Sequence, residues 1–94
     1  MDFEWDEAKR KENLRKHGVD FFRAALIFEN AIIEQIDDRE DYGEERMIAL
    51  GEVDGIVYRV AYTMRGTRLR IISAMKASKN EQKIYYQTIF GRRD

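Results

Sequence analysis

Short apolar runs separated by polar or glycine-containing segments are the main pattern along this chain. Residues 31–36, 46–53, 56–63 and 68–76 are rich in Ile, Val, Tyr, Met and Leu. Short runs of this composition between polar breaks are typical of β-strands. Residues 3–5, with two aromatic side chains around one acid, predict a further short strand near the start of the chain.

Three other segments have the pattern of helices: 7–17, 21–29 and 79–90. Asp6 and Asp20 precede the first two segments and are suitable N-caps. Gly18 follows the first segment, at the position where a left-handed residue ends a helix. Ser78 and Glu81 form a capping box at the start of the third segment. The first helix is very polar and the second is apolar almost all round, so we expect the second to be buried.

The order of these elements predicts an α+β fold, a small antiparallel meander with two N-terminal helices and one C-terminal helix. Asp54-Gly55 is a strong signal for a two-residue hairpin turn, and Arg65-Gly66 predicts a second turn. The 94 residues suffice for one domain and not for two, so we expect a single domain over residues 1–94. Residues 91–94 are expected to form a tail.

Positive charge is concentrated in one part of the chain. The totals nearly balance, with 17 basic and 18 acidic residues and a net charge of −1. Six cations lie between Ile56 and Asn80, where no acid occurs: Arg59, Arg65, Arg68, Arg70, Lys76 and Lys79. Residues 37–45 are acidic instead and predict a loop. A polyanion is the natural partner of cations held on strands, and nucleic acid is the first candidate.

Strand register decides which face these cations share. With two-residue turns at Asp54-Gly55 and Arg65-Gly66, one face carries Arg46, Arg59, Arg68, Arg70 and Lys76. The opposite face is predicted to be the core, with Met47, Ala49, Tyr58, Val60, Tyr62, Leu69, Ile71, Ser73 and Met75. Guanidinium groups bind phosphate oxygens bidentately and stay charged, so the cationic face suits phosphate. The alternative is that nearby acids neutralise these arginines.

Composition also narrows the location and the chemistry. The chain has no Cys, which excludes disulfides and thiolate chemistry and fits a reducing cytoplasm. The acidic start, residues 1–6, is not typical of a signal peptide. No apolar run approaches the roughly 20 residues of a membrane span. Asp37, Asp38 and Asp41 lack the spacing of an EF-hand loop. We therefore expect a cytoplasmic protein with no membrane partner, no metal and no cofactor.

Three stretches carry a resemblance that covers nearly the whole chain. The first is Phe3-Glu4-Trp5-Asp6, followed by Asn13 and Lys16-His17-Gly18-Val19-Asp20-Phe21. The second is Glu45-Arg46 with Gly51, and the third is Arg70-Ile71-Ile72-Ser73-Ala74 with Ala77, Glu81 and Tyr85. Together and in this order they resemble the BrnT family, the toxin half of a type II toxin–antitoxin pair.

The resemblance implies a compact RelE-like ribonuclease toxin fold and metal-independent RNA cleavage that inhibits translation. It also implies neutralisation by a cognate BrnA-type antitoxin. Antitoxins of that kind carry a ribbon-helix-helix DNA-binding part. Operator DNA would therefore be bound only through the toxin–antitoxin complex.

Candidate roles follow from the chemistry of RNA cleavage, which needs a base, an acid and cations for the developing charge. Either proton-transfer role suits His17, the only histidine, because an imidazole can accept or donate a proton. We assign Arg46, Arg59 and Arg70 to the scissile phosphate, with Lys76 as a further catalytic cation.

Substrate-binding candidates are Lys16, Arg68 and Tyr85. Lys16 and Arg68 would contact phosphates, and Tyr85 would stack on a base or lend a hydroxyl. Each has a structural alternative: a solvated helix face for Lys16, ion pairing for Arg68, and packing with Ile84 and Ile89 for Tyr85. The alternative for His17 is that it caps the helix end by bonding a carbonyl.

Met75 is the main departure from the family pattern, which usually continues Ser-Ala with Arg. Lys76 is one residue further and points to the opposite side in a regular strand, and a bulge would be needed to bring it into place. A second reading of the chain is therefore a catalytically weakened or inactive toxin-fold module. Such a module would bind antitoxin or RNA without cutting it.

Overall fold

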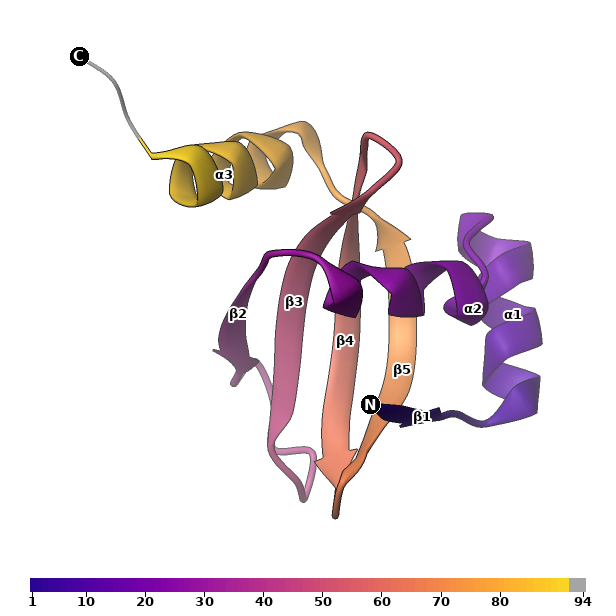
Figure 1. Ribbon diagram of the computed structural model, residues 1–94. Coiled ribbons are helices and arrows are strands. Elements are labelled where there is room, and N and C mark those ends of the chain that lie inside the picture. Colours follow the sequence, from indigo (N-terminus) through magenta and orange to yellow (C-terminus); the bar gives the residue numbers. More distant parts are fainter. Residues whose placement is uncertain (92–94) are drawn as a thin grey trace.

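The computed structural model describes residues 1–91, which form a five-stranded sheet with helices on both of its faces (Figure 1). Residues 92–94, most of the expected tail, lie outside the described residues. The elements in chain order are β1 (Asp2–Glu4), α1 (Glu7–His17), α2 (Phe21–Ala24), the 3₁₀ helix η1 (Ala25–Glu29), β2 (Ile32–Asp37), β3 (Arg46–Val53), β4 (Ile56–Arg65), β5 (Arg68–Lys76) and α3 (Lys79–Phe90).

The predicted α+β class and the antiparallel meander are confirmed. The strands lie in the order β1-β5-β4-β3-β2, and all neighbours are antiparallel except β1 and β5. The parallel pairing of β1 with the start of β5 was not predicted, because nothing in a three-residue strand indicates its partner. It places Glu4 beside Arg70 at the edge of the sheet.

The helix ends form as expected. Asp6 Oδ1 accepts hydrogen bonds from the backbone N–H groups of Ala8 and Lys9, at 2.8 and 3.2 Å. Gly18 ends α1 with a φ of 70°, a conformation that glycine adopts without strain. Both bonds of the capping box are present at the start of α3. The second predicted helix begins at Phe21 as expected but continues as the 3₁₀ helix η1 from Ala25.

The main core lies between one face of the sheet and the segment formed by α2 and η1. Phe21 and Ile27 from that segment are fully buried, as are Val60 and Ile71 from β4 and β5. On the opposite face, α3 covers only one end of the sheet and builds a smaller cluster from Leu50, Val57, Ala77 and Tyr85 (Figure 1). The predicted arginines of strands β3, β4 and β5 lie on this same face.

The first hairpin turn is confirmed, and the second lies one residue later than predicted. Asp54 and Gly55 have φ angles of 50° and 83°, as a tight two-residue turn of the favoured hand requires. In the second hairpin Arg65 pairs with Arg68, so the turn residues are Gly66 and Thr67. The register therefore shifts by two residues, which leaves each side chain near the turn on its predicted face.

A β-bulge then reverses the faces in the second half of β5. Tyr62 pairs with Ile71, but Ala61 pairs with Ser73, so Ile72 is an extra residue in β5. Beyond the bulge Ser73 and Met75 share the face of Arg59, whereas Ala74 and Lys76 lie on the other face. The prediction that Ser73 and Met75 belong to the core face and Lys76 to the cationic face is therefore wrong. One inserted residue exchanges the two sides of a strand.

Asn13 fastens α1 to β5 just beyond this bulge. Its side chain is buried and donates hydrogen bonds to the carbonyl oxygens of Val19 and Ala74, at 2.9 and 2.8 Å. Its Oδ1 accepts a bond of 3.1 Å from the N–H of Ala74. Because β1 pairs only with residues 68–70 of β5, the Asn13 amide takes the place of a neighbouring strand at Ala74.

Gly51 has no side chain because η1 crosses β3 at this point. A Cβ atom on Gly51 would lie 2.6 Å from Cβ of Ile27 and 3.0 Å from a methyl group of Ile32. No rotamer change moves a Cβ atom out of the way. The close approach of η1 and β3 therefore explains why a glycine occupies position 51, one of the positions on which the family resemblance rests.

Asn13→Ala is expected to lower the free energy of unfolding by about 2–4 kcal/mol, because it leaves three backbone polar groups without their partner. Urea unfolding followed by the fluorescence of Trp5 measures this change. The matched control is Asn80→Ala, an exposed position in the first turn of α3. A loss no larger than that of the control would show that Asn13 does not hold α1 to β5.

Candidate functional site

Arginines from three adjacent strands share the sheet face opposite the main core. Arg46 begins β3, Arg59 lies in β4 across from Leu50, and Arg70 lies in β5 across from Thr63. Alternation along each strand brings their side chains to the same face. Arg68 joins them at the edge beside β1. Four arginines of the predicted cationic face are confirmed and Lys76 is not; Arg46, Arg59, Arg68 and Arg70 together form the arginine face.

Each of these arginines has an acidic partner. Arg59 Nε lies 3.1 Å from Glu81 Oε2 of α3, and Arg46 Nε lies 3.7 Å from Glu44 Oε2. Arg70 and Arg68 share Glu4, at 2.9 and 3.7 Å. The alternative prediction, that nearby acids neutralise the arginines, therefore holds for the protein without a ligand. Only Glu44 belongs to the acidic segment 37–45, whereas Glu4 and Glu81 come from β1 and α3. Ion pairs near the surface contribute little net stability, so a phosphate can compete for the arginines.

The hydrogen bond from Arg70 has a measurable consequence for Glu4. It holds the pKa of that carboxyl below its usual value, and the neighbouring charges of Arg70 and Arg68 act in the same direction. Glu4 is therefore ionised at neutral pH and remains a ligand for both guanidinium groups. A bound phosphate would take over this role at Arg70.

The Arg46 side chain is held by the loop that follows β2. Its Cζ lies 4.0 Å from the centre of the Tyr42 ring, and the Tyr42 hydroxyl donates to Asp37 Oδ2 at 3.2 Å. Asp37 also accepts two bonds from the Arg39 guanidinium and one from the Arg39 backbone N–H, which help to lower the pKa of its carboxyl to about 2. Arg46 Nε is buried and has no hydrogen-bond partner within residues 1–91. Its nearest acid is Glu44, whose Oε2 lies 3.7 Å away, beyond hydrogen-bond distance.

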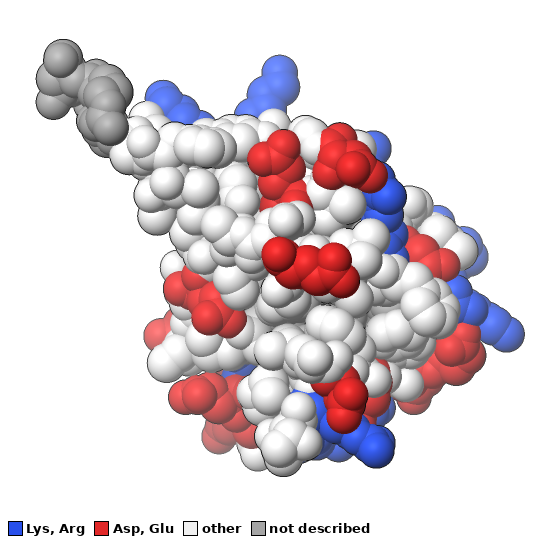
Figure 2. All heavy atoms as spheres, viewed as in Figure 1, with Lys and Arg blue, Asp and Glu red and all other residues white. Residues whose placement is uncertain are grey.

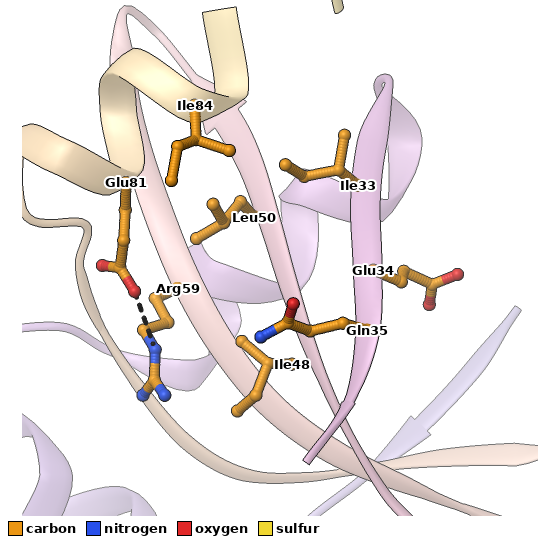
Figure 3. Close-up of a pocket in the computed structure, with 8 residues that line it drawn as sticks. All are labelled: Ile33, Glu34, Gln35, Ile48, Leu50, Arg59, Glu81 and Ile84. Atoms are coloured by element: carbon orange, nitrogen blue, oxygen red, sulfur yellow. Dashed lines mark ion pairs between the residues drawn. The ribbon is translucent and has the colours of Figure 1, made fainter. Parts of the chain in front are cut away.

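A groove of about 230 Å³ lies between α3 and strands β2, β3 and β4. It is lined by Ile33, Glu34, Gln35, Ile48, Leu50, Arg59, Glu81 and Ile84. Figure 3 shows the ion pair of Arg59 and Glu81 at one side of the groove and Ile84 above it, reaching down from α3. The floor is apolar, and the cationic group stands at its edge.

Glu81 has two roles in this arrangement. Its Oε1 accepts the N–H of Ser78 at 2.9 Å and completes the capping box. Its Oε2 binds Arg59 Nε, which leaves the two terminal nitrogens of the guanidinium pointing away from Glu81 (Figure 3). The sequence showed the cap but not the contact with Arg59. Glu4 was missed in the same way, because both contacts join segments far apart in the chain.

The remaining basic candidates lie elsewhere. Asn13 places α1 alongside β5 at Ala74, and both elements then continue in the same direction (Figure 1). His17 and Lys16 at the end of α1 are therefore near the end of β5, where Lys76 points to the side opposite Arg59. All three are exposed. No hydrogen bond or ion pair within the described chain joins them to the arginine face.

Tyr85 occupies the packing position that was its structural alternative. Only 3% of its surface is exposed, and it packs with Leu50, Val57 and Ala77. Its hydroxyl donates to the carbonyl oxygen of Ala31 at 2.7 Å, which ties α3 to the residue before β2. Burial raises the pKa of this hydroxyl. The ring has no free face for a nucleobase in this arrangement.

The face covered by α2 and η1 has a different distribution of charge. Figure 2 shows acidic side chains spread over its middle, with Lys and Arg mainly toward its edges. This face does not present a continuous cationic surface. None of the helices formed by residues 1–91 has the length and apolar composition that a membrane span requires.

The fold and the site together define a small α+β protein with an arginine-bearing sheet face, consistent with a RelE-like fold. A family model described as "Ribonuclease toxin, BrnT, of type II toxin-antitoxin system" matches residues 5–81. The chain therefore belongs to the BrnT family of ribonuclease toxins. A toxin of this type implies a cognate antitoxin as its partner. A search of curated proteins finds no match to the chain.

Two substitutions separate the roles of Glu81. Glu81→Gln keeps a residue that supports the capping box, so it should change stability little, but it removes the carboxylate from Arg59. Ser78→Ala should lower the free energy of unfolding by about 1 kcal/mol and leave the Arg59 pair intact. Urea unfolding and the NMR signal of the Arg59 Nε–H measure the two effects. Equal shifts of that signal in both variants would contradict the assignment.

Proposed function

We propose that this chain is a metal-independent endoribonuclease that inhibits translation, and that Arg46, Arg59 and Arg70 bind the scissile phosphate. One observation carries the proposal: three adjacent strands of a BrnT-family chain direct these arginines to the same sheet face. Arg68, at the edge of this face, adds a contact to a neighbouring phosphate. The strand register fixes the point on the sheet from which each arginine extends before the substrate arrives.

The arginines supply the charge that the transition state needs. Cleavage by attack of the 2′-hydroxyl builds negative charge on the phosphate oxygens, and guanidinium groups stabilise that charge while remaining protonated. Glu81 engages Arg59 at Nε, and within residues 1–91 the two terminal nitrogens of Arg59 have no acidic partner, so they can bind phosphate oxygens. With three guanidinium groups the charge can be balanced without a metal ion.

For the proton transfers we retain His17 as acid or base, with Lys76 as the nearby cation. Both belong to the corner formed by the end of α1 and the end of β5, together with Lys16. This corner is not on the arginine face. A general acid or base acts only within hydrogen-bond reach of the cleaved bond, so this proposal places that bond at the end of β5, between Arg59 and His17. Lys16 then binds a phosphate outside the cleaved bond.

Met75 lies directly across from Arg59 on the arginine face. The position where the family pattern has an arginine therefore points toward the proposed phosphate site. Lys76 does not replace that arginine, because the bulge turns it to the opposite side. This placement favours a weakened ribonuclease, and it is the observation behind the second candidate, a module that binds antitoxin or RNA without cutting.

The partner that we propose is a BrnA-type antitoxin with a ribbon-helix-helix part. Family membership supports it, because a type II toxin is paired with a cognate antitoxin. Binding of operator DNA would then be a property of the complex. The toxin itself contributes its fold and the surface that the antitoxin covers.

RNA cleavage in the presence of EDTA tests the proposal. Purified protein should cleave total RNA with and without EDTA, and Met75→Arg should raise the rate by roughly 10²-fold, because a cation is restored beside Arg59. Gel electrophoresis of the products measures both rates. If neither form cleaves RNA, the binding module is the correct reading of this chain.

Arg70→Ala should slow cleavage by roughly 10²- to 10³-fold, because one guanidinium is lost from the transition state. Circular dichroism checks that the variant stays folded. Arg23→Ala is the matched control, since Arg23 makes an ion pair of the same length with Asp54 and lies away from the arginine face. Unchanged cleavage by Arg70→Ala would remove Arg70 from the site.

A further inference from the structure

The groove beside Arg59 has the chemical character of a site for a flat, mostly apolar group. Ile33, Ile48 and Leu50 come from β2 and β3, and Ile84 closes the groove from α3 (Figure 3). Pockets of this kind combine an apolar lining with a few polar groups that fix the orientation of a ligand. Arg59 provides one such polar group at the edge.

Gln35 provides the second polar group. Its side chain points into the groove, whereas the neighbouring Glu34 points away from it (Figure 3). Gln35 is exposed, and its amide makes no hydrogen bond to any other described residue. A primary amide offers two donors and one acceptor. It can therefore form two parallel hydrogen bonds with the edge of a nucleobase.

We propose that this groove binds the nucleobase of the nucleotide whose phosphate is held by Arg59, with Gln35 reading the edge of the base. The inference rests on the proposed ribonuclease function and adds a determinant of sequence preference. The apolar side chains contact the faces of the base, and the guanidinium binds the phosphate. Unstacked bases in single-stranded RNA are recognised by this combination of apolar contact and edge hydrogen bonds.

Electrostatics favours a nucleobase over an acidic protein segment as the occupant. Glu81 already pairs with Arg59, the one arginine that lines the groove, and Glu34 points away from it (Figure 3). An acidic segment would therefore have to compete with the Glu81 carboxylate inside the groove. A nucleobase is neutral, and its phosphate reaches Arg59 from outside the groove.

Cleavage selectivity tests the role of Gln35. Gln35→Leu should reduce the preference among the four bases at the cleaved position by roughly fivefold to a hundredfold, since one pair of edge hydrogen bonds is lost. The readout is the distribution of cleavage sites in a randomised RNA. Gln87→Leu, an exposed position on α3 outside the groove, is the matched control. Unchanged selectivity with normal cleavage overturns the subsite and leaves the proposed function standing.

Direct binding tests the subsite independently of cleavage. The four nucleoside monophosphates should shift the NMR signals of Ile33, Gln35 and Ile48, and inorganic phosphate should shift only those of the arginine face. Gln35→Leu should weaken nucleotide binding and leave phosphate binding unchanged. Identical shifts with phosphate and nucleotides overturn the proposal. Groove signals that respond only to the antitoxin assign the groove to that partner instead.

Discussion

The extra residue at Ile72 is the constraint on which the rest of the sheet depends. Before it, β5 turns Leu69 and Ile71 into the core and Arg70 toward the opposite face. After it, Ala74 enters the core. The three hydrogen bonds between Asn13 and the backbone at Val19 and Ala74 hold this part of β5, because β1 does not reach it. A residue slip in β5 would exchange core and surface along half of the strand.

Three acids from separate parts of the chain offset most of the positive charge of the four arginines on the arginine face. Glu4 enters from β1, Glu44 from the loop before β3 and Glu81 from α3. Arg68 and Arg70 share Glu4, which offsets the repulsion between these two guanidinium groups. The same pairs orient each guanidinium. Folding and phosphate binding thus place opposite demands on these acids, which must neutralise the arginines yet give way to a phosphate.

Local signals in the sequence predicted most of the elements. Asp6, Asp20, Ser78 and Gly18 act within one helical turn, so their effect is visible in a short stretch of residues. Asp54-Gly55 likewise determines the β3–β4 hairpin through its own φ angles. The second turn was displaced by one residue, since Gly66 accepts either of two adjacent turn positions. The side chains near the turn still lie on their predicted faces, because a register shift of two residues does not change the side of the sheet to which a side chain points.

The sequence by itself determined the α+β order, the helix ends, the first hairpin and the presence of arginines on one sheet face, because these depend on contacts between near neighbours or on strict alternation. Only the tertiary structure decided that Met75 and not Lys76 faces Arg59, that Tyr85 is buried, and that Glu81 and Gln35 belong to the groove. These outcomes depend on a bulge and on the packing of α3 against strands far away in the chain. Alternation along a single strand contains no information about either.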